Sequence, residues 1–308
     1  MFVVDFKLML YWLGIRPQEA GMNGKKTVVA IMYDFDKTLT TKDMQEYTFI
    51  PKVGMTASEF WGKSDVLARE QGMDRILAYM KLMLDEATSH GHSIHRDDFV
   101  ALGRDLEFFP GVRDWFNHIQ LRGQALGVEI QHYIISSGLR EIIEGSAIGA
   151  EFRRIYASEY LYGRDGIAQW PKLAVNFTAK TQFLFRINKG VLDVYEDTRL
   201  NDHTPEDERA IPFRNMVYIG DGLTDVPCMK LVKSNGGKSI AVYQQGSMDV
   251  CKKLMRENRI DYYALADYSD GAPLSTLVAA ILRKIKAEED LVQLHNTQAR
   301  EAWCQAQN

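Results

Sequence analysis

The 308-residue chain is long enough for one large domain or a domain with a substantial insertion, and 46% of its residues are hydrophobic. Its 37 basic and 41 acidic residues give a net charge of -4, so no basic surplus indicates a nucleic-acid partner. The cysteines Cys228, Cys251 and Cys304 are widely spaced and form no C-x-x-C pair, which argues against a disulfide framework or structural zinc and favours a reducing cytoplasm.

The chain begins with an apolar stretch, MFVVDFKLMLYWLG, that is broken by Asp5 and Lys7. It is shorter than the roughly 20 apolar residues that a membrane span needs, so no span is predicted. We expect residues 1–21 to be an N-terminal extension that packs as a short helix on the body. A signal peptide is the minor alternative, and Met22 is an alternative functional start.

Continuous apolar runs rich in valine and isoleucine recur along the chain and are typical of strands covered on both faces. They lie at 27–35, 128–137, 215–222 and 238–243, with a further candidate at 261–268. Helical patterns separate them, for example at 139–150 and 226–233. This alternation predicts an α/β fold with a doubly wound, mainly parallel, Rossmann-like sheet.

The segment 42–108 departs from this rhythm, because it has no convincing buried strand. Met73, Ile76, Met80 and Leu84 recur at helical spacing, so we predict a helical cap over 42–108, inserted into a core of 22–41 and 109–287. A hairpin is expected at 157–174, a solvated loop at 193–209 and an amphipathic helix at 274–285. The tail 288–308 is expected to be a further exposed helix or disordered.

Two aspartates follow the first strand in IMYDFDKTLT, on either side of Phe35. Residues two apart in a strand point the same way, so Asp34 and Asp36 would project together from its carboxyl end, where open parallel sheets bind ligands. Adjacent carboxylates repel unless a cation or a shared proton neutralises them. The motif therefore predicts a metal, a shared proton or both.

Three further motifs add polar groups at element ends. Asp221 follows another apolar run in YIGDGLTD, with Asp225 a helical turn later and with Gly220 and Gly222 allowing a sharp turn. Carboxylate and carbonyl oxygens suit Mg²⁺. HYIISSG ends a third run in Ser136 and Ser137, whose hydroxyls suit a phosphate, and Lys180 supplies a positive charge for the same anion.

In the order DFDKT, YIISSG, Lys180 and GDGLTD, these motifs resemble the haloacid dehalogenase-like hydrolases, in particular the phosphoserine-phosphatase-like branch with a helical cap. The resemblance implies that Asp34 is the nucleophile and that Asp36 is the general acid and base. It also implies that Asp34, the Asp36 carbonyl and Asp221 hold Mg²⁺.

The resemblance further implies that Ser136, with Ser137 as an open alternative, and Lys180 bind phosphate. Thr38 would fix the loop, and Asp225 would orient Lys180 or a metal-bound water. Lys37 stands where many relatives have glycine, and a lysine there also occurs in ion-pumping ATPases of the family. Those pumps carry threonine at the position of Asp36, whereas this chain has the aspartate.

We therefore expect a Mg²⁺-dependent cytoplasmic phosphatase that hydrolyses a small phosphomonoester through an aspartyl-phosphate. A phosphotransferase or phosphomutase using the same intermediate is the main alternative, and a non-catalytic phosphate- or protein-binding module ranks below it.

Asp43 and Glu46 could meet a substrate amine under the cap, or could simply be charges at a helix start. His90, His92 and His95 fit no zinc spacing and are expected to be solvated. The oligomeric state and the substrate are left open.

Overall fold

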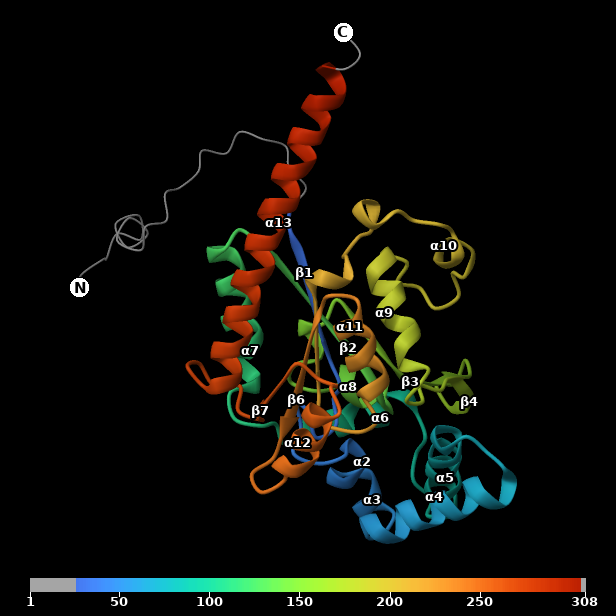
Figure 1. Ribbon diagram of the computed structural model, residues 1–308. Helices are drawn as coiled ribbons and strands as arrows, with labels where there is room; N and C mark the ends of the chain where they lie inside the picture. Colours follow the sequence, from blue (N-terminus) through green and yellow to red (C-terminus); the bar gives the residue numbers. More distant parts are fainter. Residues whose placement is uncertain (1–25, 306–308) are drawn as a thin grey trace, which may run out of the picture.

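The computed structural model describes residues 26–305 and is built around one seven-stranded sheet (Figure 1). The predicted extension 1–21 lies outside the described residues. The strand order is β4 (Ala168–Leu173), β3 (Arg154–Tyr162), β2 (Glu129–Leu139), β1 (Val28–Tyr33), β5 (Met216–Gly220), β6 (Lys238–Tyr243) and β7 (Tyr262–Leu265). Only the β3–β4 pair is antiparallel. Because the chain winds outward from β1 in both directions, β1 lies at the switch point of a doubly wound sheet, as predicted.

Helices cover both faces of this sheet, which explains why its central strands β1 and β5 are apolar. Val29, Ile31 and Tyr33 of β1 pack with α7 (Val112–Ala125) and α13 (Pro273–Gln305). Ala30 and Met32 face the opposite layer. That layer consists of α9 (Lys180–Lys189), α11 (Val226–Ser234) and α12 (Met248–Arg256). The result is a three-layer core whose central strand is buried from Val29 to Tyr33.

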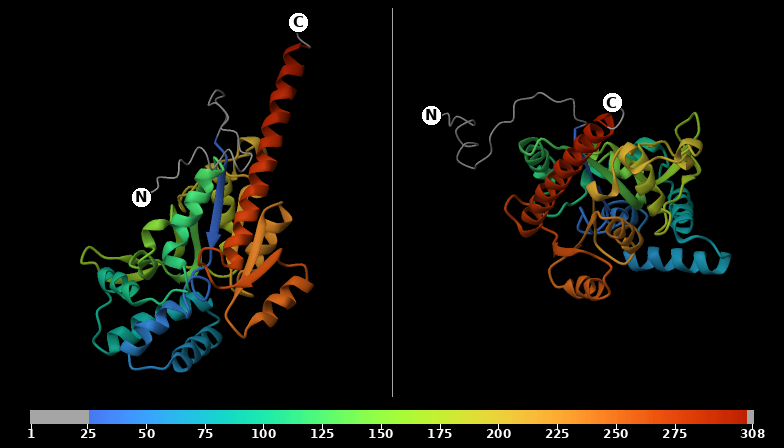
Figure 2. Two further views of the ribbon diagram at one scale, coloured as in Figure 1. Left: turned by 90° about the vertical axis from the view of Figure 1, so that its left-hand side faces the viewer. Right: turned by 45° about the horizontal axis from the view of Figure 1, so that its top comes forward.

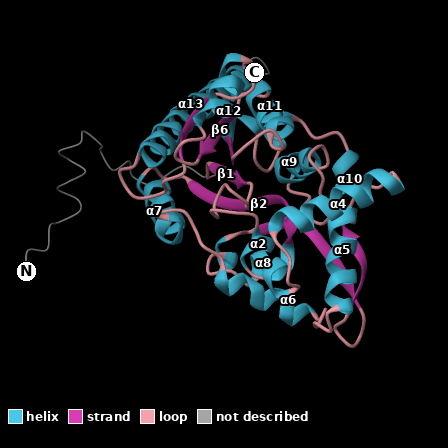
Figure 3. Cartoon of the chain, turned by 90° about the horizontal axis from the view of Figure 1, so that it is seen from below, coloured by secondary structure: helices cyan, strands magenta, loops and turns pink. Residues whose placement is uncertain are grey.

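The segment between β1 and α7 forms the inserted helical cap that the sequence predicts. Its helices are α2 (Met44–Tyr47), α3 (Phe49–Lys52), α4 (Ala57–Gln71), α5 (Arg75–Ser89) and α6 (Arg96–Leu102), followed by a 3-10 turn at Gly103–Asp105. A capping box of Thr56 and Glu59 begins α4, and the Asp74 side chain caps α5. In the view from below, α2 lies next to β2, whereas α4 and α5 lie to the side, where α5 contacts β4 (Figure 3).

The two ends of the cap segment meet at its base. Thr40 and Phe108 form an antiparallel bridge, the Thr41 N–H donates to the Glu107 carbonyl at 3.1 Å, and the Phe109 N–H donates to the Leu39 carbonyl at 3.0 Å. The chain thus leaves the core and returns to it at one place.

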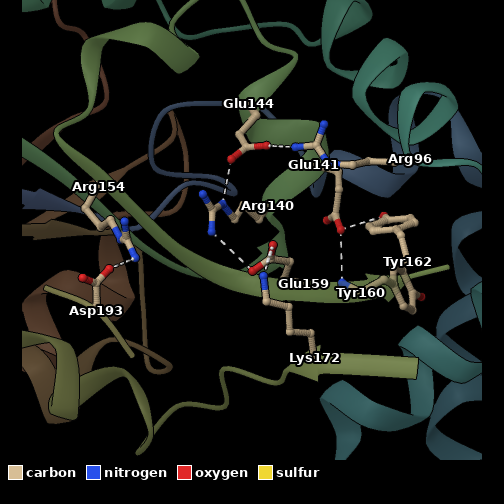
Figure 4. Close-up of polar contacts among 10 residues, drawn as sticks. All are labelled: Arg96, Arg140, Glu141, Glu144, Arg154, Glu159, Tyr160, Tyr162, Lys172 and Asp193. Carbon is tan, nitrogen blue, oxygen red and sulfur yellow. Dashed lines mark hydrogen bonds and ion pairs between the residues drawn. The ribbon is translucent and has the colours of Figure 1, made fainter. Parts of the chain in front are cut away.

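The cap is also joined to the β3–β4 hairpin. The Ala168 N–H donates to the Ile94 carbonyl at 3.0 Å, and Tyr160 Oη donates to the Met80 carbonyl at 2.6 Å. Figure 4 shows ion pairs that continue this connection. They run from Arg96 of α6 to Glu144 of α8 (Arg140–Glu144), and through Arg140 and Glu159 to Lys172. The β3–β4 hairpin therefore contacts both the core and the cap.

Several elements differ from the sequence prediction. The helix expected at 139–150 is only α8, which ends before Gly145, and a 3-10 turn at Gly149–Glu151 follows. The Val100 carbonyl packs closely against Gly145, where a side chain would lie 1.8 Å from its oxygen. The predicted loop 193–209 contains α10 (Thr198–Asn201) and a 3-10 turn at Glu206–Glu208, and another turn, Phe213–Asn215, precedes β5. The predicted hairpin is present, and its strand β3 also extends the parallel sheet beside β2.

The C-terminal helix extends well beyond the residues 274–285 at which an amphipathic helix is predicted. α13 begins with buried Leu274 and Val278 and continues to Gln305, so its described tail is helical. Figure 2 shows the final turns extending beyond the body of the molecule. Leu291 and Leu294 are exposed there. Within residues 26–305, no helix is both long enough and apolar enough to cross a bilayer.

Candidate active site

The acidic residues singled out in the sequence converge at the carboxyl ends of β1 and β5. Asp34 follows β1, and its N–H donates to the Ile219 carbonyl of β5 at 2.9 Å. Asp221 follows β5, and Asp225 directly precedes α11. Carboxylate oxygens of Asp34, Asp221 and Asp225 lie within 4.8 Å of one another. Asp34 and Asp221 meet because β1 and β5 are parallel neighbours, and the turn from Gly222 to Asp225 adds the third carboxylate.

Lys180, the first residue of α9, lies inside this cluster. Its Nζ donates to Asp34 Oδ1 at 2.8 Å and to Asp225 Oδ1 at 2.8 Å, and only 1% of the residue is exposed. Burial alone would lower the pKa of Lys180, but the charges of Asp225 and Asp34 outweigh it and raise the pKa. The side chain therefore stays charged. Tyr218 Oη also donates to Asp225 Oδ1, at 2.8 Å.

The cluster still has an excess of negative charge. Burial, followed by the neighbouring Asp225, raises the pKa of Asp34 to about 7 and that of Asp221 to about 8. One lysine opposes three carboxyl groups, and Asp225 Oδ2 is buried without a hydrogen-bond partner among residues 26–305. Hard oxygen donors with unbalanced charge are the donor set that a divalent cation such as Mg²⁺ prefers.

Asp36 lies beside this cluster, at the base of the cap. Its Oδ1 accepts the Met44 N–H at 2.7 Å. A side chain at Gly138 would lie 2.8 Å from Asp36 Oδ2 and 2.1 Å from the Met44 methyl carbon, so it would displace one or both of these groups. Burial, followed by the charges of Asp43 and Asp34, raises the pKa of Asp36 well above its usual range. A carboxyl group of this kind can hold a proton near neutral pH.

The two serines lie within β2, which continues past both of them. Ser136 Oγ accepts the Gly138 N–H at 3.0 Å, whereas Ser137 Oγ is buried without a partner in the described part of the chain. The Ser137 carbonyl accepts from Tyr79 Oη of the cap at 2.7 Å and from Ser158 Oγ at 3.1 Å. Across the described ranges, no hydrogen bond joins either serine hydroxyl to Asp34 or Lys180.

The supporting residues differ in part from expectation. The Thr38 hydroxyl is buried and has no partner within 26–305, while the Thr38 carbonyl accepts from Tyr268 Oη at 2.8 Å. The neighbouring Thr40 hydroxyl instead donates to the Lys42 carbonyl at 2.9 Å. Of the two predicted glycines, only Gly220 is crowded: a side chain there would lie 2.6 Å from Asp225 Oδ2, whereas Gly222 faces open space.

Sequence reasoning missed several residues that hold the loop after β1. Tyr268 reaches it from beyond β7, and Gln244 Nε2 donates to the Thr41 carbonyl at 3.0 Å. These residues come from parts of the chain with no motif of their own, so no local signal could find them. One isolated feature went as expected: the side chains of His90 and His92 are exposed, and each bonds a backbone carbonyl.

The comparisons place the chain in a family. Residues 31–230, more than half of the sequence, match the family described as "haloacid dehalogenase-like hydrolase". The chain therefore belongs to this family. An uncharacterized protein of Borreliella burgdorferi is 29% identical over 280 residues, covering 82% of this chain and 96% of that relative.

Solved structures agree on the fold. A haloacid dehalogenase family hydrolase from Salmonella enterica serovar Typhi is 17% identical and superposes with a TM-score of 0.52, over 91% of this chain and 81% of that one. A substrate-bound phosphoserine phosphatase is 14% identical with a TM-score of 0.50, over 80% and 96% of the two chains. The family and the capped fold inferred from the sequence are therefore confirmed.

Proposed function

We propose that this protein is a divalent-cation-dependent phosphatase that hydrolyses a small phosphomonoester through an aspartyl-phosphate on Asp34. The observation that carries the proposal is the contact of Asp34 with Lys180 inside a cluster that also contains Asp221 and Asp225. A carboxylate so placed can attack phosphorus while neighbouring cations neutralise the phosphoryl oxygens.

The described residues fit a metal ion. Asp34, Asp221 and the backbone carbonyl of Asp36 would hold it, and the excess negative charge of the cluster supports this assignment. When bound, Mg²⁺ supplies positive charge that offsets the repulsion between the nucleophile and the phosphoryl group. Asp225 is a positioning residue that holds Lys180 through its Oδ1.

The chemistry of the side chains follows from their placement. An oxygen of Asp34 forms a bond to phosphorus as the bond between phosphorus and the alcohol oxygen breaks. Asp36, whose raised pKa favours its protonated form, donates a proton to that alcohol. A water molecule then attacks phosphorus and gives a proton to Asp36. The bond between phosphorus and the Asp34 oxygen breaks, so that phosphate is released and the Asp34 carboxylate is restored. Lys180 and a hydroxyl of Ser136 or Ser137 bind the phosphoryl oxygens.

The start of the cap lies beside the site, because the Met44 N–H bonds the Asp36 carboxylate, and this favours a small substrate from which bulk water is excluded. The free, buried Cys228 and Cys251 are compatible with the cytoplasmic location that we propose.

The test is turnover of p-nitrophenyl phosphate with Mg²⁺ by the whole protein and by Asp34→Asn. We expect the variant and the EDTA-treated wild type to lose turnover by at least about two orders of magnitude. Full activity of Asp34→Asn would overturn the proposal. Analysis of products with an added sugar acceptor separates hydrolysis from transfer, because transfer yields a new sugar phosphate instead of inorganic phosphate.

A further inference from the structure

The side of the site that faces the leaving alcohol is defined by Asp36. Under the proposed function, Asp36 gives its proton to the alcohol oxygen, so the rest of the alcohol extends past Asp36 toward the cap. The Asp36 carboxylate accepts the N–H of Met44, the first residue of α2, at 2.7 Å. The start of α2 therefore lies next to the alcohol, and Asp43 is the residue immediately before it.

An internal ion pair occupies this position. Lys37 Nζ lies 2.6 Å from Asp43 Oδ2, with 44% of the lysine side chain and 23% of the aspartate side chain exposed. Glu46 lies on the same helix and accepts the Trp61 indole N–H at 3.2 Å. The three charged groups line one part of the cap base, and the lysine is the one cation that contacts Asp43 among the described residues.

The backbone at Lys37 is unusual. Its φ is +58°, in the left-handed region that glycine adopts without cost and that other residues rarely adopt. Within 26–305, Asn258 is the only other non-glycine residue with a positive φ, and asparagine tolerates that conformation better than lysine. A lysine kept in a glycine-like conformation beside a catalytic loop indicates that its side chain has a role there.

The charges suggest what that role is. Without Lys37, the carboxylates of Asp43 and Glu46 would give the alcohol side two uncompensated negative charges, and these would attract a substrate ammonium group. With Lys37 in place, an incoming ammonium must displace it from Asp43 and remain close to a like charge. A repulsive element of this kind is a common source of specificity.

We propose that Lys37 is a specificity-determining residue that occupies Asp43 and thereby excludes phosphomonoesters whose alcohol carries an ammonium group, in favour of uncharged hydroxylated alcohols. The proposal rests on the proposed phosphatase function. It also answers the expectation that Asp43 and Glu46 could meet a substrate amine, since Asp43 is already paired within the chain.

Two substrates of similar size test the role of Lys37. O-phosphoethanolamine carries an ammonium group at the position where 2-hydroxyethyl phosphate carries a hydroxyl group. The measured quantity is the ratio of kcat/KM for the amine ester to kcat/KM for the hydroxyl ester. We expect this ratio to be below about 0.1 in the wild type and to rise at least about tenfold in Lys37→Met. Lys42→Met is the matched control, because Lys42 lies on the same loop with its ammonium over the Tyr47 ring, and its ratio should stay at the wild-type value.

Asp43→Asn tests the same pair from the other side. It leaves the Lys37 ammonium without its carboxylate, so the ratio should fall below the wild-type value. Thermal melting of each variant confirms that it is folded, and a ratio is independent of the fraction of active protein. A wild-type ratio near or above one, or an unchanged ratio in both variants, would overturn the role of Lys37.

Failure of the phosphatase proposal is distinguishable from this result. If the wild type does not hydrolyse p-nitrophenyl phosphate with Mg²⁺, the function itself is wrong. If it does, and the ratios do not move, only the assignment of Lys37 is wrong.

Discussion

Lys180 and Asp34 are 146 positions apart in the chain, yet the ammonium group of one lies 2.8 Å from a carboxylate oxygen of the other, and both are buried. Lys180 is the first residue of α9 and Asp34 directly follows β1, so the contact exists only when the helical layer has packed on the sheet. This pair couples the integrity of the core to the chemistry proposed for it.

Replacing Lys180 with methionine should impair both activity and stability. We expect kcat/KM for p-nitrophenyl phosphate to fall by about 10²–10³, because a charge proposed to bind phosphoryl oxygens is lost. In EDTA, the free energy of unfolding should fall by about 3–5 kcal/mol, since Asp34 and Asp225 lose their buried counterion. Urea unfolding measures this. Lys230→Met, on the exposed face of the neighbouring helix α11, is the control and should differ little from wild type. Wild-type stability of Lys180→Met in EDTA would contradict the buried pair.

Replacing Gly138 with alanine should reduce turnover at least about tenfold, because the new methyl group would displace the Asp36 carboxylate and the end of Met44. The measurement is kcat/KM with p-nitrophenyl phosphate. Gly62→Ala is a matched control: Gly62 lies within α4 with open space around it, and alanine there should preserve turnover and slightly stabilise the helix. Equal activity of the two variants would show that space at residue 138 is not limiting.

Asp221→Asn should weaken the stabilisation that Mg²⁺ gives to the fold. A cation that binds only the folded state raises the free energy of unfolding by about 1.4 kcal/mol at ten times its dissociation constant. We therefore expect a Mg²⁺-dependent rise in Tm for wild type and a much smaller rise for Asp221→Asn. Asp249→Asn, whose side chain is 97% exposed, should retain the full rise. The same Mg²⁺ response in all three proteins would argue against a site at Asp221.

His132 should make the protein sensitive to acid. Its Nδ1 lies 3.0 Å from Tyr33 Oη, which accepts the Trp115 indole N–H at 2.8 Å, and burial lowers the pKa of His132 from 6.5 to about 3. The unfolded chain therefore takes up this proton at a higher pH than the folded protein does. The contribution is fully present above pH 6.5 and is lost as the pH falls toward 3, by up to about 1.4 kcal/mol per pH unit.

The check is the slope of unfolding free energy against pH between 6.5 and 4, compared for wild type and His132→Asn. The variant should show a shallower slope even if its stability at neutral pH is lower. The exposed His203→Asn should keep the wild-type slope. Identical slopes for His132→Asn and wild type would remove His132 as the cause.

The parts of this fold that sequence predicts are those with a local signature. The apolar runs located the central strands, and the polar residues that end them, such as Asp34 and Asp221, were found because a strand end is visible as a change in composition. The helical cap was found because its apolar residues recur at helical spacing.

The parts that sequence does not predict depend on distant contacts. The close approach of the Val100 carbonyl to Gly145, directly after α8, and the hydrogen bond from Tyr268 to the Thr38 carbonyl both join residues far apart in the chain. The pairing of Lys37 with Asp43 could not be distinguished from two solvated charges, because it depends on the left-handed turn that Lys37 adopts. Tertiary packing decides the first two of these features, whereas the third depends on the backbone conformation of a single residue.

The bridge between Thr40 and Phe108 has an evolutionary consequence. Because the cap leaves and re-enters the core through adjacent residues, its length can change without moving β1 or α7, and the closure entropy of the inserted segment grows only slowly with its length. Exchange of 42–108 for the corresponding segment of a relative would therefore be a natural route to new substrate preferences, with the β3–β4 hairpin as the surface that a foreign cap must match.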